Sequence, residues 1–370
     1  MILQQQLLTR VFELGANQAV AGEFSARAFD NDKLDLVQAE AIADAIDATS
    51  VAAAKSAMRS LTGEFSQKIN ALLEQLIQLR LYVEAAIDFP DEEGVDFLAD
   101  EHIAKQLRQV CEQLNNVLAT AKQGQLLRDG VSVVIAGRPN AGKSSLLNRL
   151  AGQERAIVTD IAGTTRDILQ ETIVLNGLTL NLTDTAGLRQ TDDIVEQAGI
   201  ERARQAITQA DLLLMVYDAH REHEPLRLAT ELFGSLPNAN SILMIANKID
   251  LSDNHQNLPK QFSSQEQIYH PVYVSCKYGT GLEELVNQIC DKVGFHPPEN
   301  SLIARTRHLD ALRRTQMALQ EADEQLHLFH AGELVAESLR QAQLSLNEIT
   351  GEFTADDLLG KIFGSFCIGK

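Results

Sequence analysis

Two hydrophobic patterns alternate along this chain. Between residues 33 and 122 apolar positions recur every three or four residues, as at Ile103, Leu107, Val110 and Leu114. This spacing is typical of amphipathic helices. It predicts helices over about residues 34–58 and 64–88 and a third around residues 103–118. Phe89-Pro90 is expected to end the second helix, because proline cannot continue one.

The pattern changes after Arg128-Asp129-Gly130, where residues 131–136 form a β-branched run. Further short apolar runs are predicted as strands at residues 178–184, 212–217, 241–246 and 272–274. Strands that alternate with helices predict a doubly wound, mainly parallel sheet. Pro297-Pro298 marks a linker, after which the helical pattern returns to about residue 358.

These patterns predict an α/β domain inserted into a discontinuous all-α helical domain. The expected boundaries are residues 33–125 for the first helical part, 126–296 for the α/β domain and 297–370 for the second helical part. Residues 1–32 stand apart as an N-terminal segment.

Composition and charge indicate the compartment in which the protein works and limit how it can bind nucleic acid. The formal charge of −19 argues against a protein that grips nucleic acid over its whole surface. One basic cluster is either a local RNA patch or a solvated helix face, namely Arg305, Arg307, Arg313 and Arg314. The four cysteines form no CxxC pair, and no run approaches 18 apolar residues. We therefore expect a cytoplasmic protein with no membrane span and no secretion signal.

The sequence GRPNAGKS at residues 137–144 fits the phosphate-binding pattern GxxxxGK[ST], between a predicted strand and a predicted helix. Its glycines let backbone N–H groups close around phosphates at the positive end of the helix. Lys143 is expected to reach the β- and γ-phosphates of a nucleotide. The hydroxyl of Ser144 is expected to ligate Mg²⁺.

A second motif, DTAG, follows the predicted strand at residues 178–184. Asp184 is expected to hold the Mg²⁺ shell through water, and the N–H of Gly187 is expected to sense the γ-phosphate.

A third motif, NKID at residues 247–250, ends another predicted strand. The carboxylate of Asp250 can accept hydrogen bonds from both N1–H and the exocyclic amine of guanine, whereas adenine offers no such pair. Lys248 is expected to cover the base plane. The tripeptide Ser275-Cys276-Lys277 occupies the place of a second base loop, with cysteine where GTPases usually have alanine.

Three motifs in this order, each after a strand, predict a P-loop GTPase. The residue after DTAG is Leu188, where Ras-like enzymes place a glutamine that orients water. An apolar side chain cannot do this, so another group must. Arg166 and Arg189 are nearby candidates for the counter-charge in the transition state.

The chain resembles the MnmE/TrmE family of tRNA-modification GTPases over nearly its whole length. The resemblance rests on the phosphate-binding loop and on GEFS (22–25), NDKLDL (31–36), EAAIDFPDEE (84–93), TDIAGTTRD (159–167) and FCIGK (366–370). The flanking motifs are not general to GTPases.

The resemblance implies which groups supply the counter-charge and orient the water in place of an arginine and a glutamine. In this family a K⁺ ion stands where an arginine would act. The matching ligands here are Asn140, Thr159, Ile161 and Thr164. Thr165 matches the threonine that joins Ser144 on Mg²⁺, and Glu196 matches the glutamate that positions the hydrolytic water. The motifs and the family resemblance together predict that the following residues contact GTP: Asn140, Ala141, Gly142, Lys143, Ser144, Ser145, Thr159, Thr164, Thr165, Asp184, Thr185, Ala186, Gly187, Asn247, Lys248, Asp250, Ser275, Cys276 and Lys277.

The resemblance also implies partners. Family members form homodimers, bind a 5-formyltetrahydrofolate-type folate and work with the flavin-dependent protein MnmG (GidA). Together they install a carboxymethylaminomethyl or aminomethyl group at C5 of the wobble uridine of certain tRNAs. Lys33 and Lys370 match positions at the folate pocket, and Cys367 matches the C-terminal cysteine.

One departure concerns the N-terminal segment. Most of the family's folate-binding and dimerising domain is absent, so residues 1–32 are predicted to be its remnant, with Ala21 where the family has proline. Weak folate binding and weak dimerisation are therefore expected. Two other functions stay open: a ribosome-assembly GTPase of the Era/EngA kind, and a nucleotide-gated scaffold.

Overall fold

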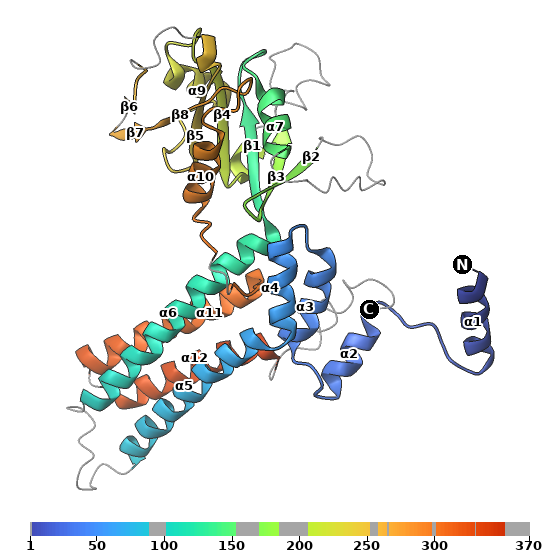
Figure 1. Cartoon of the computed structure of the whole chain (residues 1–370). Helices are drawn as coiled ribbons and strands as arrows, with labels where there is room; N and C mark the ends of the chain where they lie inside the picture. The colour runs from blue at the N-terminus through green and yellow to red at the C-terminus, as the bar shows by residue number, and fades with distance from the viewer. Residues whose placement is uncertain are drawn as a thin grey trace. The chain divides into compact units, whose positions relative to one another are not determined.

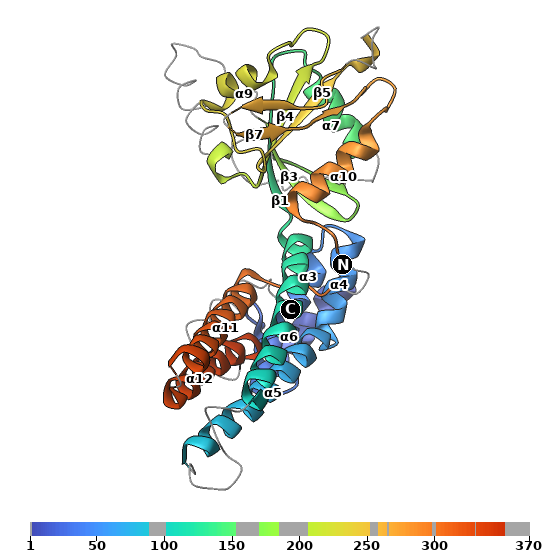
Figure 2. The same cartoon turned by 90° about the vertical axis from the view of Figure 1, so that its left-hand side faces the viewer.

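A computed structural model describes residues 2–88, 101–152, 170–184, 206–251, 258–264, 266–297, 301–329 and 331–351. The chain divides into two compact units (Figures 1 and 2). The helical unit contains Met1–Ala48, Ala53–Gly124 and Asn300–Lys370, and the α/β unit contains Thr49–Ala52 and Gln125–Glu299. No helix in the described ranges is long and apolar enough to cross a membrane.

The first part of the helical unit holds α1 (Ile2–Glu13), α2 (Glu23–Asp30), α3 (Leu36–Asp47), most of α4 (Val51–Leu61), α5 (Glu64–Asp88) and most of α6 (Glu101–Asp129). The second part holds α11 (Thr306–Glu324), a π-helical turn (Gln325–Phe329) and α12 (Gly332–Thr350). The helices α1 and α2 were not predicted from the sequence.

The long helices α5, α6, α11 and α12 run side by side in both views (Figures 1 and 2). One apolar core joins them, and it includes the fully buried Leu76, Leu107, Leu312 and Leu339. The amphipathic spacing predicted for residues 64–88 and 103–118 is therefore confirmed, because those positions form the buried stripes of α5 and α6.

The single helix predicted over residues 34–58 is wrong. The chain leaves the helical conformation at Ala48, where ψ is 123°, and α4 starts anew at Val51. The hydroxyl of Thr49 lies 2.7 Å from that of Thr179, and Ser50 Oγ donates to the carbonyl of Gly177 at 3.1 Å. Short hydroxyl side chains that bond outside the helix favour such breaks.

The α/β unit is built on a six-stranded sheet of order β2-β3-β1-β4-β5-β8. Its strands are β1 (Val131–Ala136), β2 (Gln170–Leu175), β3 (Leu178–Asp184), β4 (Leu212–Asp218), β5 (Ile242–Asn247) and β8 (Pro271–Tyr273). Only β2 runs antiparallel to its neighbour, and it was not among the predicted strands. A separate hairpin pairs β6 (Phe262–Ser264) with β7 (Gln267–Tyr269).

Alternate residues of the strands face opposite layers of helices. Val133 and Ile135 share a core with α7 (Lys143–Ala151) and α10 (Leu282–Val293). Val134 joins a second core with α9 (Pro225–Phe233). Because both faces are covered, the central strands β4 and β5 are apolar along nearly their whole length, as expected of a parallel sheet. The predicted doubly wound, mainly parallel sheet is confirmed.

Candidate functional site

The predicted motifs converge at the carboxyl edge of the sheet. β1 lies between β3 and β4, so the strand order reverses there, and such a reversal opens a ligand crevice. Asp184 ends β3, and Asn247 ends β5 opposite Asp218, the last residue of β4. The phosphate-binding loop leaves β1 at Ala136 beside them.

Two glycines allow the loop at residues 137–144 its close approaches. A Cβ on Gly137 would lie 2.1 Å from the carbonyl oxygen of Val216, and a Cβ on Gly142 would lie 2.1 Å from Asn247 Nδ2. Gly142 also has φ +99° and caps the N-terminus of α7. This conformation brings the first turn of α7, with Lys143 and Ser144, to the crevice, where its N–H groups suit phosphate.

The lysine of the loop is held in place by backbone carbonyls. Lys143 Nζ donates to the oxygen of Gly137 at 2.8 Å and to that of Arg138 at 3.3 Å. Asn140 has φ 63°, a left-handed conformation that asparagine tolerates better than most residues. The amide of Asn140 is a chemically suitable K⁺ ligand, and the hydroxyl of Ser144 suits Mg²⁺.

Asn247 ties the phosphate loop to the second base loop. Its side chain is 2% exposed, and Nδ2 donates to the carbonyl of Ala141 at 3.0 Å. Its Oδ1 accepts from the N–H groups of Lys248 at 2.8 Å and Cys276 at 3.2 Å. Since both amide ends are engaged, Asn247 acts in this structure as a brace between loops that are 106 and 29 residues away from it.

A pocket of about 630 Å³ lies beside this brace. Its lining includes Asp250, Ser275, Tyr273 and Tyr278. Ser275 Oγ donates to Asp250 Oδ1 at 2.6 Å, which orients the carboxylate. A pocket with an oriented carboxylate and aromatic walls is suited to a flat base with adjacent N–H donors.

Lys248 has a partner that the sequence analysis missed. Its Nζ lies 2.8 Å from Asp218 Oδ2. Burial alone would raise the pKa of Asp218, but hydrogen bonds from Lys248 and from the His220 N–H outweigh it and lower that pKa. Asp218 is therefore a carboxylate that anchors the ammonium group of Lys248. In the sequence, Asp218 could have been recognised as a site residue because it is the polar residue that ends the apolar run 212–218.

Several predicted residues lie outside the described part of the chain. They are Thr159, Ile161, Thr164, Thr165, Thr185, Ala186, Gly187, Glu196, Cys367 and Lys370. The roles expected of them stay predictions.

Lys33, predicted at a folate site, lines a cavity of about 560 Å³ in the helical unit. Phe29, Gln38, Asn70 and Thr350 are among the other lining residues. The cavity thus offers a cation, an aromatic ring and amide groups, beside the carboxylates of Asp32 and Asp35.

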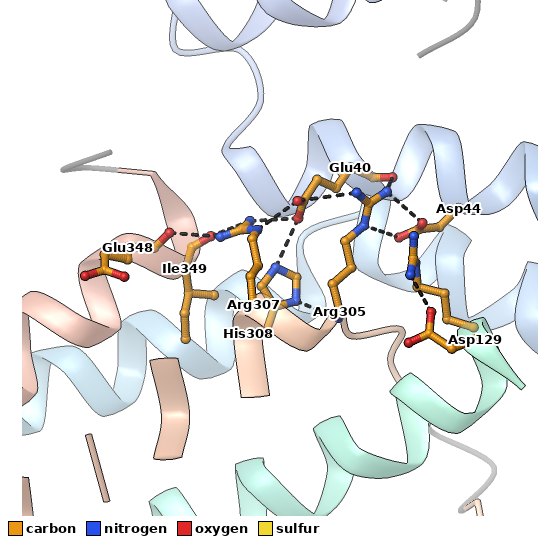
Figure 3. Close-up of polar contacts among 9 residues, drawn as sticks. Glu40, Asp44, Asp129, Arg305, Arg307, His308, Glu348 and Ile349 are labelled. Carbon is orange, nitrogen blue, oxygen red and sulfur yellow. Dashed lines mark hydrogen bonds and ion pairs between the residues drawn. The ribbon is translucent and has the colours of Figure 1, made fainter. Parts of the chain in front are cut away.

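Both alternatives for the basic cluster, a local RNA patch and a solvated helix face, are wrong for Arg305 and Arg307 (Figure 3). Both side chains are largely buried, 15% and 20% exposed. Arg307 lies 2.7 Å from Glu40, and Arg305 lies 2.8 Å from Asp44. The arginines neutralise buried carboxylates on α3 and present no cationic surface.

The other two arginines of that cluster are exposed but also paired. Arg313 bonds to Asp310 at 3.2 Å, and Arg314 forms an ion pair with Glu348. Each positive charge is thus balanced by a carboxylate.

Comparisons with known proteins identify the relatives of this chain. A model of the MnmE helical domain matches residues 36–367. The tRNA modification GTPase MnmE of Psychrobacter arcticus is 73% identical over 100% of this chain and 79% of its own length. That of Acinetobacter baylyi is 62% identical over 100% of this chain and 79% of its own length.

Among solved structures, Era from Aquifex aeolicus bound to GDP and aluminium fluoride is 26% identical, covering 51% of this chain and 66% of its own, with a TM-score of 0.31. The family match and the identity along the full chain decide the assignment. This chain belongs to the MnmE family of tRNA modification GTPases.

Proposed function

We propose that this chain hydrolyses GTP with Mg²⁺ and K⁺ and, together with the flavin-dependent protein MnmG, modifies C5 of the wobble uridine of certain tRNAs. Family membership supports the reaction class. The observation that carries the proposal is the convergence of the phosphate loop and the base loop on Asn247 at one edge of the sheet.

Each predicted site residue is assigned a role in nucleotide binding, metal binding or catalysis. Lys143 and the N-terminus of α7 would bind the phosphates, and Asp250 would select guanine. Ser144 and Thr165 would hold Mg²⁺, while Asn140, Thr159, Ile161 and Thr164 would hold K⁺. The metals supply positive charge for the transferring phosphoryl group, and Glu196 would orient water.

Two measurements test the proposal together. Immobilised chain loaded with GTP is expected to retain MnmG from a mixture of purified MnmG and ribosomal subunits, detected by flavin absorbance. It is also expected to hydrolyse GTP over many turnovers in K⁺ buffer. Retention of ribosomal subunits without flavin would point to ribosome assembly, and binding without turnover would point to a scaffold. Lys143→Ala, which removes the phosphate contact, is the negative control for turnover.

We further propose that the cavity lined by Lys33 receives the acidic end of a folate. A cation on the wall favours the carboxylates of a folate, and the ring of Phe29 suits an aromatic ligand. Lys33→Met is expected to weaken 5-formyltetrahydrofolate binding about 5- to 10-fold in calorimetry, roughly one lost charge-assisted contact. Lys68→Met, on the exposed side of α5, should leave it unchanged. Equal affinities for the two variants would remove Lys33 from the site.

A further inference from the structure

The second base loop, Ser275-Cys276-Lys277, is fastened from two sides. On one side Cys276 N–H reaches Asn247 at 3.2 Å, and Ser275 Oγ reaches Asp250 at 2.6 Å. On the other side the carbonyls of Cys276 and Lys277 both accept from Arg149. The first set of contacts belongs to the base-reading motif itself, whereas Arg149 belongs to no motif of the sequence.

Arg149 comes from the helix that carries the phosphate-binding lysine. It lies in the last turn of α7, whose first residue is Lys143. Its Nε donates to the oxygen of Cys276 at 2.8 Å, and its Nη2 donates to the oxygen of Lys277 at 2.8 Å. Two donors in the fixed fork of one guanidinium set both the position and the direction of two successive carbonyls.

The direction of these carbonyls has a consequence for the other face of the loop. In a planar trans peptide the N–H points opposite to the C=O. With the Cys276 carbonyl turned to Arg149, the N–H of Lys277 is turned away from it. Ser275 and Tyr278, which flank Cys276-Lys277 in the loop, both line the base pocket.

Guanine and adenine differ at the position that such N–H groups can read. Guanine carries the acceptor O6, whereas adenine carries an amino group there. The N–H groups of Cys276 and Tyr278 are already bonded to Asn247 and Ser275, so a loop held with the N–H of Lys277 outward favours the acceptor. A loop free to turn its carbonyls toward the base loses that preference.

We infer that Arg149 is a positioning residue for base recognition: by clamping the carbonyls of Cys276 and Lys277 it orients the loop that reads O6. The inference rests on guanine-nucleotide binding at this site, as the proposed function requires. It makes α7 responsible for both ends of the nucleotide, the phosphates through Lys143 and the base through Arg149.

The test compares GDP with the diphosphate of 2-aminopurine riboside, which keeps the exocyclic amine but lacks both O6 and the N1–H; the loss of the N1–H affects wild type and variants alike. Arg149→Met keeps the aliphatic stem and removes both donors. Its Kd for GDP is expected to rise about 5- to 10-fold, since the lost bonds are charge-assisted but partly exposed. Its Kd for the analogue is expected to stay within about twofold, and kcat at saturating GTP should be unchanged.

Arg227→Met on α9 is the matched control, because Arg227 is 73% exposed and pairs only with Glu224 and Glu231 among the contacts the structure gives it. Arg149→Lys, which keeps the charge without the fork, should fall between Arg149→Met and wild type, and it serves if Arg149→Met fails to fold. The inference is overturned if the Arg149 variants match Arg227→Met, or if they lose affinity for both nucleotides equally. A wild-type chain without preference for GDP over the analogue would instead contradict the proposed base site itself.

Discussion

Asp250 has a fixed orientation that suits the base-reading role proposed for it. Ser275 donates to one carboxylate oxygen at 2.6 Å, so the group already has a fixed orientation beside the pocket. Asp250→Asn replaces an acceptor with a donor, which mismatches guanine but matches the extra carbonyl of xanthine. We expect GTP affinity to fall at least about 10-fold and xanthosine triphosphate to become the better ligand. Competition binding with both nucleotides measures this, and an unchanged GTP preference would remove Asp250 from base reading.

Glu196 is expected to act on water and not on the bound nucleotide. Glu196→Ala should therefore lower kcat on the order of 100-fold while the Kd for GTP changes little. Single-turnover hydrolysis and equilibrium binding of a non-hydrolysable analogue separate the two quantities. A matching loss in both would mean that Glu196 supports the structure of the site.

At the scale of elements, α3 and α11 are joined by a buried ionic cluster. Glu40 is 1% exposed and receives hydrogen bonds from Arg307 and His308. Burial alone would raise the pKa of Glu40, but those bonds lower it well below its usual range. Arg307 also donates to the carbonyls of Glu348 and Ile349 at the end of α12 (Figure 3), so the cluster links three helices.

Removing the shared carboxylate should loosen this junction. Glu40→Ala leaves the largely buried guanidinium of Arg307 without its carboxylate partner, whereas Arg305 keeps Asp44, and we expect a loss of about 3 kcal/mol in the stability of the helical unit. Native-state hydrogen exchange of α3 and α11 amides measures it locally. Asp310→Ala, which breaks an exposed pair with Arg313, should cost less than about 0.5 kcal/mol. Similar losses of stability in both variants would show that the buried cluster contributes no more than an exposed ion pair.

The same cluster predicts a pH dependence. The Arg305 N–H donates to Nδ1 of His308, so Nε2 carries the hydrogen that Glu40 accepts. Burial, and then the charge of Arg307, lower the pKa of His308, despite the opposing effect of Glu40. The folded pKa is below the unfolded value of about 6.5, so the unfolded chain takes up the proton first. Stability of the helical unit should therefore fall as pH drops below about 6.5.

A second loss should follow below about pH 4.3, where Glu40 of the unfolded chain takes up a proton. His308→Gln should abolish the first phase and keep the second, in urea unfolding at pH 7, 5.5 and 4. A wild-type helical unit equally stable at pH 7 and 5.5 would contradict a neutral His308.

At the scale of the whole molecule, the proposed K⁺ requirement would separate this protein from arginine-dependent GTPases. The expected ligand set joins Asn140 to backbone oxygens near Thr159, Ile161 and Thr164. K⁺ is large enough to contact all of them and the phosphates, whereas Na⁺ is too small. GTP turnover should be at least about 10-fold faster in K⁺ than in Na⁺ at equal ionic strength.

Asn140→Ala should abolish the difference between the two salts, whereas Asn148→Ala, on the exposed side of α7, should retain it. Equal wild-type rates in both salts would exclude a catalytic K⁺ site. The comparison is made at matched ionic strength because surface charges respond to salt in general.

The features that could be predicted from the sequence are local ones. The loop of residues 137–144, the acid that ends residues 178–184 and the guanine motif at residues 247–250 each depend on backbone conformations within a few residues. Glycine spacing, strand ends and helix starts are therefore sufficient to predict them. The amphipathic stripes of α5 and α6 are local in the same sense.

Which polar groups meet across the chain could be learned only from the fold. Arg307 and Glu40 are 267 residues apart, and Arg149 and Cys276 are 127 apart. Spacing along the sequence gives no information on spatial distance at that range. From the sequence, the four arginines of residues 305–314 could therefore equally have formed an RNA-binding patch or a solvated helix face. Packing of α11 against α3 placed two of them on a buried acid, and the sheet order placed Arg149 on the base loop. The physical reason is that a charged side chain takes the partner that folding brings within reach, and a buried carboxylate must have one.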